Sequence, residues 1–314
     1  MKQIKVLAIT NVYPTVKHPG ETPCIKDQVD ALGDNGVAVD LLIIDRYHKI
    51  NYLLVALKIL LYSLGRAKYS LIHAYYGHCG LIARLQWRTP IIVTYRGSDI
   101  LGRDGIIGKW VAKRVDGVIV MSEEMKLKSA IQDAEIIPFG VNQKLFKLIP
   151  MDEARNRLGL NPHKHYILFP WNPLRPEKRF DIIKEALDLL LVEYPDTEVI
   201  TIFDKSHDQI ALYMSACNVM VLASNYEGSP MAIREAVSCR LPVVSVDVGD
   251  VGQILKNING SYIVERSPGA FAEKITQVFE NDKLLDSTNS NLVSADFAAK
   301  QVLDLYKKVL NINE

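Results

Sequence analysis

The sequence predicts an α/β protein in which two doubly wound parallel sheets face each other across a cleft. Three observations carry this prediction. The chain has 314 residues, enough for two domains of about 150 residues each. Short β-branched runs alternate with longer amphipathic segments, as in βαβ units. The alternation pauses over 138–150, PFGVNQKLFKLIP, and then restarts. We therefore expect an N-terminal domain over 1–145, a C-terminal domain over 146–294 and a final helix over 295–314. This helix could pack back on the N-terminal domain.

The N-terminal domain is expected to alternate strands with helices throughout. Each expected strand is a run of Val, Ile and Leu too short for a helix, and each expected helix is a longer segment with apolar residues on one side. The strands are expected over 4–10, 37–44, 71–74, 91–94, 118–121 and 135–137, and the helices over 23–32, 51–64, 79–86, 106–115 and 123–131.

The same pattern continues in the C-terminal domain. Strands are expected over 166–169, 198–202, 219–223 and 242–247, and helices over 177–192, 207–215, 230–238, 270–280 and 295–310. In doubly wound folds, ligands bind outside the carboxyl ends of the strands. The loops that follow these strands are therefore the places to look for site residues.

The formal charge is close to zero but unevenly distributed. The chain holds 37 basic and 36 acidic side chains, a net charge of +1 that argues against a general nucleic-acid binder. Residues 1–150 hold 20 basic and 13 acidic side chains, a net +7, whereas residues 151–314 hold 17 and 23, a net −6. Between Arg46 and Ser98 the chain has no Asp or Glu. A basic surface on the first domain would attract an anionic partner.

The segment 51–68, NYLLVALKILLYSLGRAK, has a broad apolar face with cations at its edges. Two interpretations are open: a helix buried in the first domain, or a helix that lies on an anionic membrane surface through residues 46–68. The apolar run over 50–64 has 15 residues, too few to span a bilayer. The four cysteines form no CxxC motif, which favours a reducing compartment. We expect a cytoplasmic protein, bound peripherally to the inner face of the cell membrane under the second interpretation.

Polar residues gather in the segment 223–252, which follows a predicted strand. Ser229 is expected to cap a helix that begins at Pro230. The free amides at the start of this helix, near 228–232, would bind an anion. Glu227 in the loop and Glu235 in the helix would both face one ligand and hold its hydroxyl groups. The alternative is that both glutamates are solvated surface charges.

The Glu-x7-Glu spacing of this segment, followed by LPVVSVDVG, resembles the donor-site motif of the family 4 retaining glycosyltransferases, also called glycosyl transferases group 1. That family has the GT-B fold of two Rossmann-like domains. Four other segments resemble the family in order and spacing: KVLAITNVYP near the N-terminus, VTYRGSDI over 93–100, IIPFGVN over 136–142 and LFPWNPLRPEKRFD over 168–181. The resemblance covers nearly the whole chain and is to members of the bacterial surface-polysaccharide type.

The resemblance implies a role for each matched residue. Arg175 and Lys178 would bind the donor diphosphate. Glu235 would hold the nucleotide ribose, and Glu227 would contact the donor sugar. Glu227, Glu235 and Arg96 would take part in catalysis. The other residues implied on the donor side are Gly20, Gly228, Ser229, Pro230 and Met231, and those implied on the acceptor side are Arg96, Ser98 and Asp99.

The chain departs from the family at three places. The segment LFPWNPLRPEKR differs from the usual Gly-Arg form of the family, so the match of Arg175 to the family's arginine is approximate. Arg96 stands where family members usually carry His, and it would neutralise either the departing phosphate or an anionic acceptor. Only 48 residues separate Lys178 from Glu227, where the family often has one more βα unit, so the base is not predicted. No Asp-x-Asp motif is present, and neither a metal nor another cofactor is indicated. His73 and His78 are better explained as structural residues than as metal ligands.

The expected function is that of a retaining hexosyltransferase. It would transfer a hexose-type sugar from a nucleoside-diphosphate sugar to a hydroxyl of a saccharide acceptor, expected to be lipid-linked, in polysaccharide biosynthesis. Two alternatives remain open. One is a GT-B nucleotide-sugar epimerase, which converts the donor alone. The other is a catalytically degenerate GT-B subunit that binds a nucleotide sugar or a partner. No nucleic-acid partner is expected.

Overall fold

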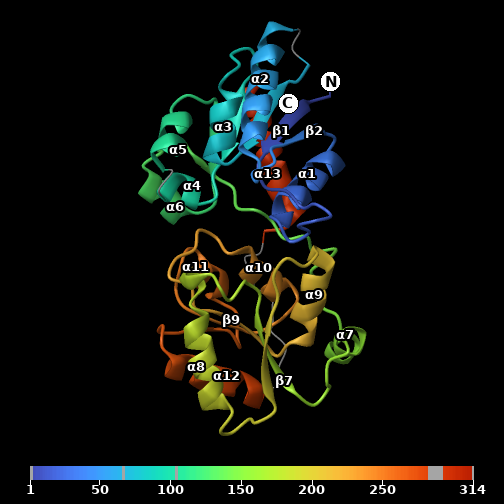
Figure 1. The fold of residues 1–314 in the computed structure, drawn as a ribbon, viewed down its shortest axis with the longest axis vertical. Helices are drawn as coiled ribbons and strands as arrows, with labels where there is room; N and C mark the ends of the chain where they lie inside the picture. The colour runs from blue at the N-terminus through green and yellow to red at the C-terminus, as the bar shows by residue number, and fades with distance from the viewer. Residues whose placement is uncertain (1–2, 66–67, 103–104, 282–292, 313–314) are drawn as a thin grey trace. The chain divides into compact units, whose positions relative to one another are not determined.

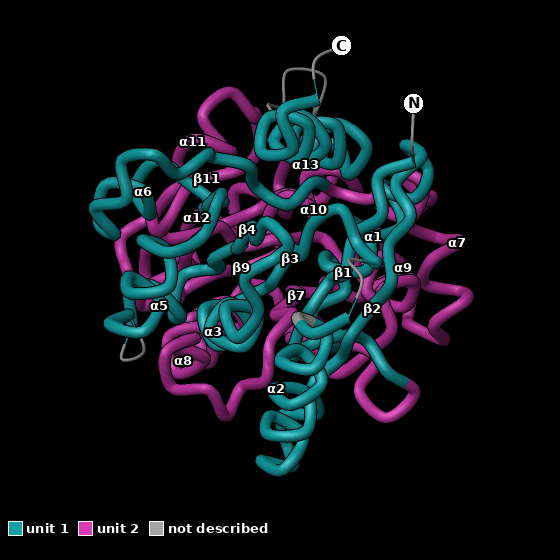
Figure 2. The backbone as a smooth tube through the Cα atoms, turned by 90° about the horizontal axis from the view of Figure 1, so that it is seen from above, with its two compact units in different colours: residues 1–15, 21–140, 293–314 teal, residues 16–20, 141–292 magenta. Residues whose placement is uncertain are grey.

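The computed structural model of the chain describes residues 3–65, 68–102, 105–281 and 293–312 (Figure 1). The chain divides into two compact units, which Figure 2 shows in two colours. Each unit is an α/β domain built on its own parallel sheet, so the predicted fold class is confirmed. Unit 1 comprises Met1–Thr15, Glu21–Gly140 and Val293–Glu314, and unit 2 comprises Val16–Gly20 and Val141–Leu292.

The sheet of unit 1 is parallel, with the strand order β2-β1-β3-β4-β5-β6. The middle strands β3 and β4 are buried along their whole length, as expected of parallel strands covered on both faces. Each strand lies where the sequence predicts it, and no end differs by more than one residue. The bounds are β1 Lys5–Thr10, β2 Ala38–Ile43, β3 Leu71–Tyr75, β4 Ile91–Thr94, β5 Gly117–Val120 and β6 Glu135–Ile136.

The helices of unit 1 follow the strands, as predicted, with one addition. The helix α4 has four residues, too few to display a helical period in the sequence. The described helices are α1 Pro23–Asp34, α2 Lys49–Leu64, α3 Gly77–Ala83, α4 Ser98–Leu101, α5 Gly105–Ala112, α6 Glu123–Ser129 and α13 Ala295–Val309.

The helix α2 is exposed on one side, so the interpretation of it as a buried helix is wrong. Val55 and Ile59 are buried, but Leu53, Leu57 and Leu61 are 56%, 48% and 64% exposed. Residues four apart lie on the same face of a helix, so these leucines form an apolar stripe open to solvent. Within the described residues, no helix is long and apolar enough to cross a membrane.

The helix α13 returns the chain to unit 1, where it packs beside α1 (Figure 1). The Ser294 hydroxyl caps it by accepting a hydrogen bond from the Phe297 amide at 3.1 Å. The Tyr306 hydroxyl lies 2.6 Å from His73 Nδ1, and the other ring nitrogen of His73 lies 2.7 Å from the Thr94 hydroxyl. A buried polar network therefore joins α13 to β3 and β4.

The sheet of unit 2 is also parallel, in the order β11-β10-β9-β7-β8. The strand order reverses between β7 and β9, and in unit 1 it reverses between β1 and β3. Such reversals open crevices at the carboxyl edge of a sheet where ligands bind. The bounds are β7 His165–Phe169, β8 Thr197–Thr201, β9 Val219–Leu222, β10 Val243–Ser245 and β11 Tyr262–Ile263.

The helices of unit 2 cover both faces of its sheet. The predicted helices over 207–215, 230–238 and 270–280 are confirmed with ends within two residues. The short elements α7, α11 and β11 are additions to the prediction. The bounds are α7 Met151–Leu158, η1 Pro176–Lys178, α8 Phe180–Leu190, α9 His207–Ala216, α10 Met231–Ser238, α11 Val251–Leu255 and α12 Pro268–Asn281.

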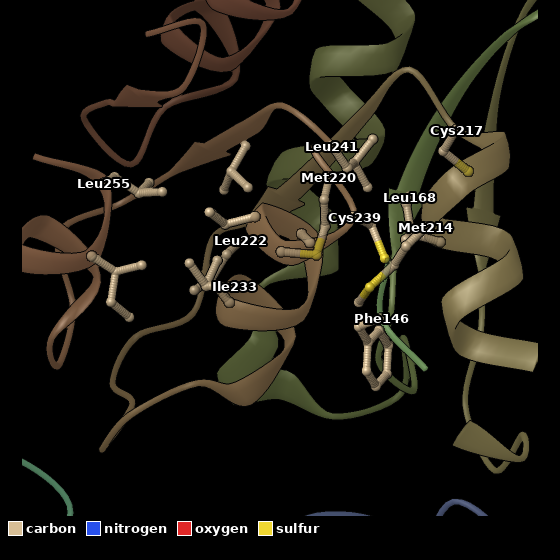
Figure 3. Packing of buried hydrophobic residues seen from close by; sticks show 14 of the residues in the cluster. Phe146, Leu168, Met214, Cys217, Met220, Leu222, Ile233, Cys239, Leu241 and Leu255 are labelled. Atoms are coloured by element: carbon tan, nitrogen blue, oxygen red, sulfur yellow. The ribbon is translucent and has the colours of Figure 1, made fainter. Parts of the chain in front are cut away.

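Alternate strand residues of unit 2 supply two separate apolar cores. Leu168 and Met220 face α9, α10 and α11 in one core, part of which Figure 3 shows. Their neighbours Ile167 and Val219 face α8 and α12 in the other core. Because successive side chains of a strand point to opposite faces, continuous apolar runs are what a sheet covered on both faces requires. The two cores fix the sheet and leave its carboxyl edge free for polar loops.

We expect His73 to make the folded state of unit 1 sensitive to acid. Burial lowers the pKa of His73 to about 3. In the unfolded chain its pKa is about 6.5, so below that pH the unfolded state binds a proton that the folded state does not. This residue should therefore lower the free energy of unfolding by about 2 kcal/mol between pH 7 and pH 5.

Urea unfolding at each pH measures this effect. The variant His73→Asn keeps hydrogen-bonding groups but does not titrate in this range, so its acid sensitivity should be smaller by that amount. Equal acid sensitivity of the two proteins would contradict the prediction.

Candidate functional site

The candidate site of unit 2 lies at the carboxyl edge of the sheet, where the strand order reverses between β7 and β9. The loop after β7 carries Trp171 and Lys178, and the loop after β9 carries Glu227. Lys178 Nζ lies 2.5 Å from Glu227 Oε1 and 4.7 Å from the centre of the Trp171 ring. Two residues that the resemblance assigns to the donor are thus brought into direct contact.

The Lys178–Glu227 pair is largely shielded from solvent. The two side chains are 6% and 14% exposed. Burial lowers the pKa of Lys178 below its ordinary value, and the charge of Glu227 opposes that shift. Removing either partner from a buried pair leaves a charge with no counter-ion, which is strongly unfavourable. The pair therefore presents a desolvated cation and a desolvated carboxylate side by side.

Lys178 reaches this position because the predicted helix over 177–192 is broken at its start. Residues Pro176–Lys178 form a single 3-10 turn, and Arg179 then adopts a left-handed backbone with φ 53° and ψ 48°. A left-handed residue does not continue a right-handed helix, so α8 begins only at Phe180. Arg175 lies before the turn, where its guanidinium pairs with Glu177 at 2.6 Å and its side chain is 54% exposed.

The predicted cap of the next site helix is wrong. The helix α10 begins at Met231, and Pro230 is its N-cap residue, with no side-chain hydrogen bond to the first turn. The Ser229 hydroxyl instead donates to Asp250 Oδ2 at 2.8 Å. Asp250 also pairs with Arg234, and both side chains are buried. A hydrogen bond to a carboxylate is stronger than one between neutral groups, which favours the orientation of the hydroxyl toward Asp250.

Glu235 faces a different partner from Glu227. It lies inside α10 and is 6% exposed. Its Oε1 atom is 2.9 Å from Nε2 of His207, the first residue of α9. The His207 ring packs edge-on against Phe146. Because both glutamates are mostly buried and have specific partners, the alternative that they are solvated surface charges is wrong.

Two glycines at this edge are required by close backbone approaches. Gly249 has φ +60°, and a Cβ atom there would lie 2.6 Å from the carbonyl oxygen of Gly228. Gly20 belongs to the segment of unit 2 formed by 16–20, and a Cβ atom there would lie 3.0 Å from the Cα atom of Asp204. The loops that carry Glu227 and Gly20 are thus packed directly on the loops that follow β10 and β8.

The residues predicted on the acceptor side lie together in unit 1: Arg96 in the connection between β4 and α4, and Ser98 and Asp99 in the first turn of α4. Asp99 is buried, and its Oδ1 atom accepts 3.0 Å hydrogen bonds from the backbone amides of Arg96 and Gly97. Burial raises the pKa of the Asp99 carboxyl above its ordinary value. Asp99 therefore holds the loop in shape, whereas Ser98 is exposed at the start of α4.

Two further observations concern metals and thiols. Among the residues that the structure describes, no group of three or more His, Cys, Asp or Glu side chains is arranged to hold a metal ion. His73 is held by Tyr306 and Thr94, which accounts for it as a structural residue. The four cysteines are buried and are not joined by disulfide bonds.

Three residues of this site escaped the sequence analysis: Trp171, His207 and Asp250. Each lies in or at the end of the connection that follows a strand, β7, β8 and β10 respectively. Their position after a predicted strand was the sequence signal that could have identified them, because loops at the carboxyl edge carry the ligand-binding side chains of such folds.

Comparison with a solved structure identifies the fold. The chain is similar to Anabaena Alr3699/HepE, solved in complex with UDP and glucose, with a TM-score of 0.67 and 16% identity over 98% of this chain and 99% of that chain. At this identity the likeness establishes the fold alone. The two parallel-sheet domains are those of the GT-B glycosyltransferases.

Sequence comparisons show similarity to glycosyltransferases. The model of the family described as glycosyl transferases group 1 matches residues 195–292, which include Glu227, α10 and Asp250. An uncharacterized glycosyltransferase of Methanocaldococcus jannaschii is 24% identical, with 78% of this chain and 76% of that protein covered. The glycosyltransferase TuaC of Bacillus subtilis, whose name refers to teichuronic acid biosynthesis, is 26% identical, with 68% and 62% covered. The protein is therefore a glycosyltransferase that is similar to group 1 over residues 195–292.

We expect Gly249→Ala to destabilise the packing of its loop against the loop that carries Glu227. The new methyl group would meet the carbonyl oxygen of Gly228, and alanine is strained at φ +60°. The free energy of unfolding should fall by about 1 to 3 kcal/mol, which urea unfolding measures. Gly269→Ala is the matched control, because a Cβ atom at Gly269 has no neighbour within 4 Å. If the two variants are equally stable, the close approach at Gly249 does not constrain the loop.

Proposed function

We propose that this protein is a retaining glycosyltransferase that transfers a hexose-type sugar from a nucleoside-diphosphate sugar to a hydroxyl of a lipid-linked saccharide in polysaccharide biosynthesis. The observation that carries the proposal is the buried Lys178–Glu227 pair at the strand-order reversal of unit 2. A donor of this class has a diphosphate and a sugar that are covalently joined. A desolvated cation beside a desolvated carboxylate is complementary to both parts of it.

In the proposed donor complex, Lys178 and the first amides of α10 bind the diphosphate, with Arg175 at the exposed rim. Glu227 accepts hydrogen bonds from the hydroxyls of the sugar, and Glu235 accepts them from the ribose. The leaving diphosphate gains negative charge in the transition state. A fixed cation in a site that excludes water stabilises that charge more than it stabilises the bound donor.

The proposed chemical step needs no nucleophile from the protein. The bond between the anomeric carbon and the phosphate oxygen breaks, and its electron pair stays on the phosphate. The acceptor hydroxyl oxygen bonds to the same carbon on the face that the phosphate leaves. The acceptor proton passes to the departing phosphate oxygen. The residues of the site therefore orient the reactants and stabilise charge.

The named relatives support the choice of donor and acceptor class. Anabaena HepE is described with UDP and glucose bound, which supports a uridine nucleotide and a hexose. The name of the Bacillus subtilis relative refers to teichuronic acid biosynthesis, which supports a polysaccharide pathway.

Donor binding is tested by thermal unfolding in the presence of UDP, GDP, ADP and TDP. The nucleotide of the true donor, at 100 times its Kd, should stabilise the protein by about 2.7 kcal/mol. Glu235→Gln removes a charged acceptor of hydrogen bonds, which is worth about 1.5 to 3 kcal/mol. Nucleotide affinity and the rate of transfer to a saccharide acceptor should both fall by about 10- to 150-fold.

Glu185→Gln, an exposed position on α8, is the matched control and should behave as the wild type. Absence of stabilisation by all four nucleotides, or undiminished transfer by folded Glu235→Gln protein, would overturn the proposal. Conversion of the donor sugar with no acceptor present would identify an epimerase instead.

The exposed stripe of α2 supports binding to an anionic membrane surface, which we include in the proposal. Leu53, Leu57 and Leu61 are about half exposed, and Lys49 and Lys58 on the same helix are exposed cations. No acidic residue occurs between positions 46 and 98 to repel anionic lipid headgroups. Each cation near such a surface contributes about 1 kcal/mol, and the leucines would enter the headgroup boundary.

Flotation with vesicles that contain phosphatidylglycerol measures this association. The wild type should co-float at low salt, and Leu57→Gln with Leu61→Gln should reduce the bound fraction several-fold. Leu127→Gln is the control, because Leu127 on α6 is equally apolar and 72% exposed. Failure of the wild type to co-float, or equal loss with the control variant, would refute membrane binding through α2.

A further inference from the structure

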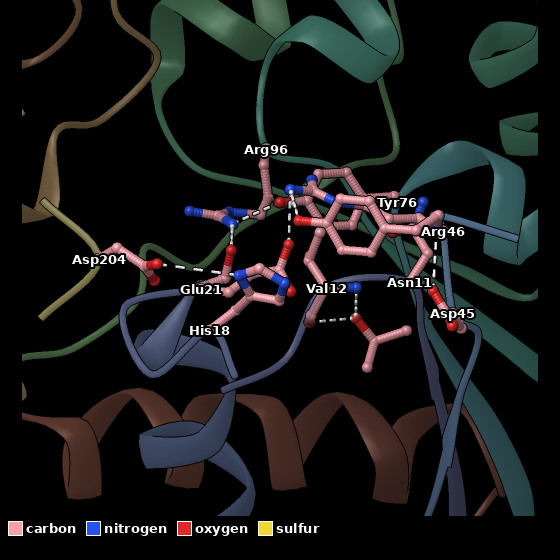
Figure 4. Close-up of polar contacts among 12 residues, drawn as sticks. Asn11, Val12, His18, Glu21, Asp45, Arg46, Tyr76, Arg96 and Asp204 are labelled. Atoms are coloured by element: carbon pink, nitrogen blue, oxygen red, sulfur yellow. Dashed lines mark hydrogen bonds and ion pairs between the residues drawn. The ribbon is translucent and has the colours of Figure 1, made fainter. Parts of the chain in front are cut away.

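Arg96 lies at the carboxyl edge of the unit 1 sheet, directly after β4. Its Nη1 atom donates hydrogen bonds to the Tyr76 hydroxyl at 2.5 Å and to the Thr22 hydroxyl at 3.2 Å. The guanidinium carbon lies 5.5 Å from the ring centres of Tyr76 and Phe139. Figure 4 shows Arg96 and Tyr76 among the polar side chains at this edge of the sheet. The guanidinium is thus held in one orientation by two hydroxyls and two aromatic rings.

The charge of Arg96 has no carboxylate in direct contact. Within the described part of the chain, its guanidinium forms hydrogen bonds only to neutral hydroxyls and joins no ion pair. The neighbouring carboxylate of Asp99 is engaged with backbone amides instead. The charge of Asp99 acts on Arg96 without direct contact, so an anion bound directly to the guanidinium would further offset the cost of burying it. Both hydrogen bonds use Nη1, so within the described residues the Nε and Nη2 donors remain available to a ligand.

The backbone that holds Arg96 is strained. Tyr76 has φ 79° and Thr22 has φ 53°, and Gly97 next to Arg96 has φ 132°. A positive φ is uncommon for a bulky or β-branched residue and costs about 1 to 3 kcal/mol. Both residues that hold the guanidinium therefore sit in unfavourable conformations. Strain of this kind concentrates at functional sites, where the surrounding fold maintains it.

Other polar side chains converge on the same edge, as Figure 4 shows. Arg46 follows β2, and its Nη2 atom lies 2.6 Å from Glu21 Oε1. Asn11 follows β1 and donates a hydrogen bond to the Tyr52 hydroxyl at 2.9 Å. The cluster thus draws on the ends of four neighbouring strands, β2, β1, β3 and β4. Arg46 has an acidic partner in it, whereas Arg96 does not.

We propose that Arg96, oriented by Tyr76 and Thr22, is a binding subsite for one anionic group of the acceptor, a phosphate or a carboxylate. The proposal rests on the proposed function, in which unit 1 receives the acceptor. A guanidinium edge presents two parallel N–H donors that match two oxygens of either anion. The subsite selects acceptors that carry a negative charge over neutral saccharides.

The subsite is tested with inorganic phosphate on the full chain, in the background Lys178→Gln with Glu227→Gln, which removes the buried cation of unit 2 together with its counter-ion. Phosphate binding is followed by thermal unfolding. The further change Arg96→Gln should weaken phosphate binding at least tenfold. Arg88→Gln is the matched control and should have no effect, because Arg88 is exposed and its guanidinium donates to the Gly65 carbonyl.

Glucose 1-phosphate and glucuronate distinguish the two sources of the anion. A loss of affinity on Arg96→Gln for either probe supports the subsite and names the charged group that it takes. Unchanged affinity for phosphate and for both probes overturns it. If Arg96→Gln does not fold, Arg96→Lys replaces it, since lysine keeps the charge but loses the paired donors. Phosphate affinity should then fall two- to tenfold, and an unchanged value overturns the proposal.

Binding of UDP distinguishes a failure of this proposal from a failure of the proposed function. Arg96→Gln protein with Lys178 intact should bind UDP as the wild type does, and loss of UDP binding would assign Arg96 to the donor and overturn the subsite. Absence of UDP binding to the wild type, together with phosphate binding that still depends on Arg96, would contradict the donor assignment and leave the subsite supported.

Discussion

Parallel strands impose one constraint on which the rest of this structure depends. Every strand of a parallel sheet ends at the same edge, so all the loops that follow the strands meet there. Apolar residues fill both faces of the sheet in unit 2, and polar residues remain at the edge. Three side chains from three different loops lie at this edge of unit 2 because of that geometry: Lys178, Glu227 and Asp250. Arg96 and Tyr76 are brought together in unit 1 for the same reason.

The two edges handle charge in opposite ways. In unit 2 each charged group that the sequence assigns to the donor already has a partner: Lys178 contacts Glu227, and Glu235 contacts His207. A ligand there must exchange one partner for another, which favours a molecule that offers both an anion and hydroxyls. In unit 1 the guanidinium of Arg96 is held by hydroxyls and strained backbone. The anion that we propose there would make the direct ion pair that Arg96 does not make with Asp99.

Runs of Val, Ile and Leu predicted the strands closely, because burial on both faces of a sheet requires those residues. Longer segments with apolar residues on one side predicted most helices. The segments around Lys178 and Glu227 were both assigned to the donor, and the structure brings these two side chains into contact, whereas Glu235 contacts His207. Three features depended on contacts that no local pattern records. Ser229 bonds Asp250 rather than its own helix, and Arg179 breaks the helix that its neighbours favour. Leu57 lies on an apolar face, but periodicity does not reveal whether anything covers that face.

The return of α13 to unit 1 sets an order of assembly during synthesis. The sheet of unit 2 is complete in the nascent chain before α13 has been made. The imidazole of His73, by contrast, must wait for Tyr306, which lies 233 residues further along the chain. Contacts of such long sequence separation form slowly. The buried hydrogen bond between His73 and Tyr306 therefore forms only after every strand of unit 2 has been synthesised.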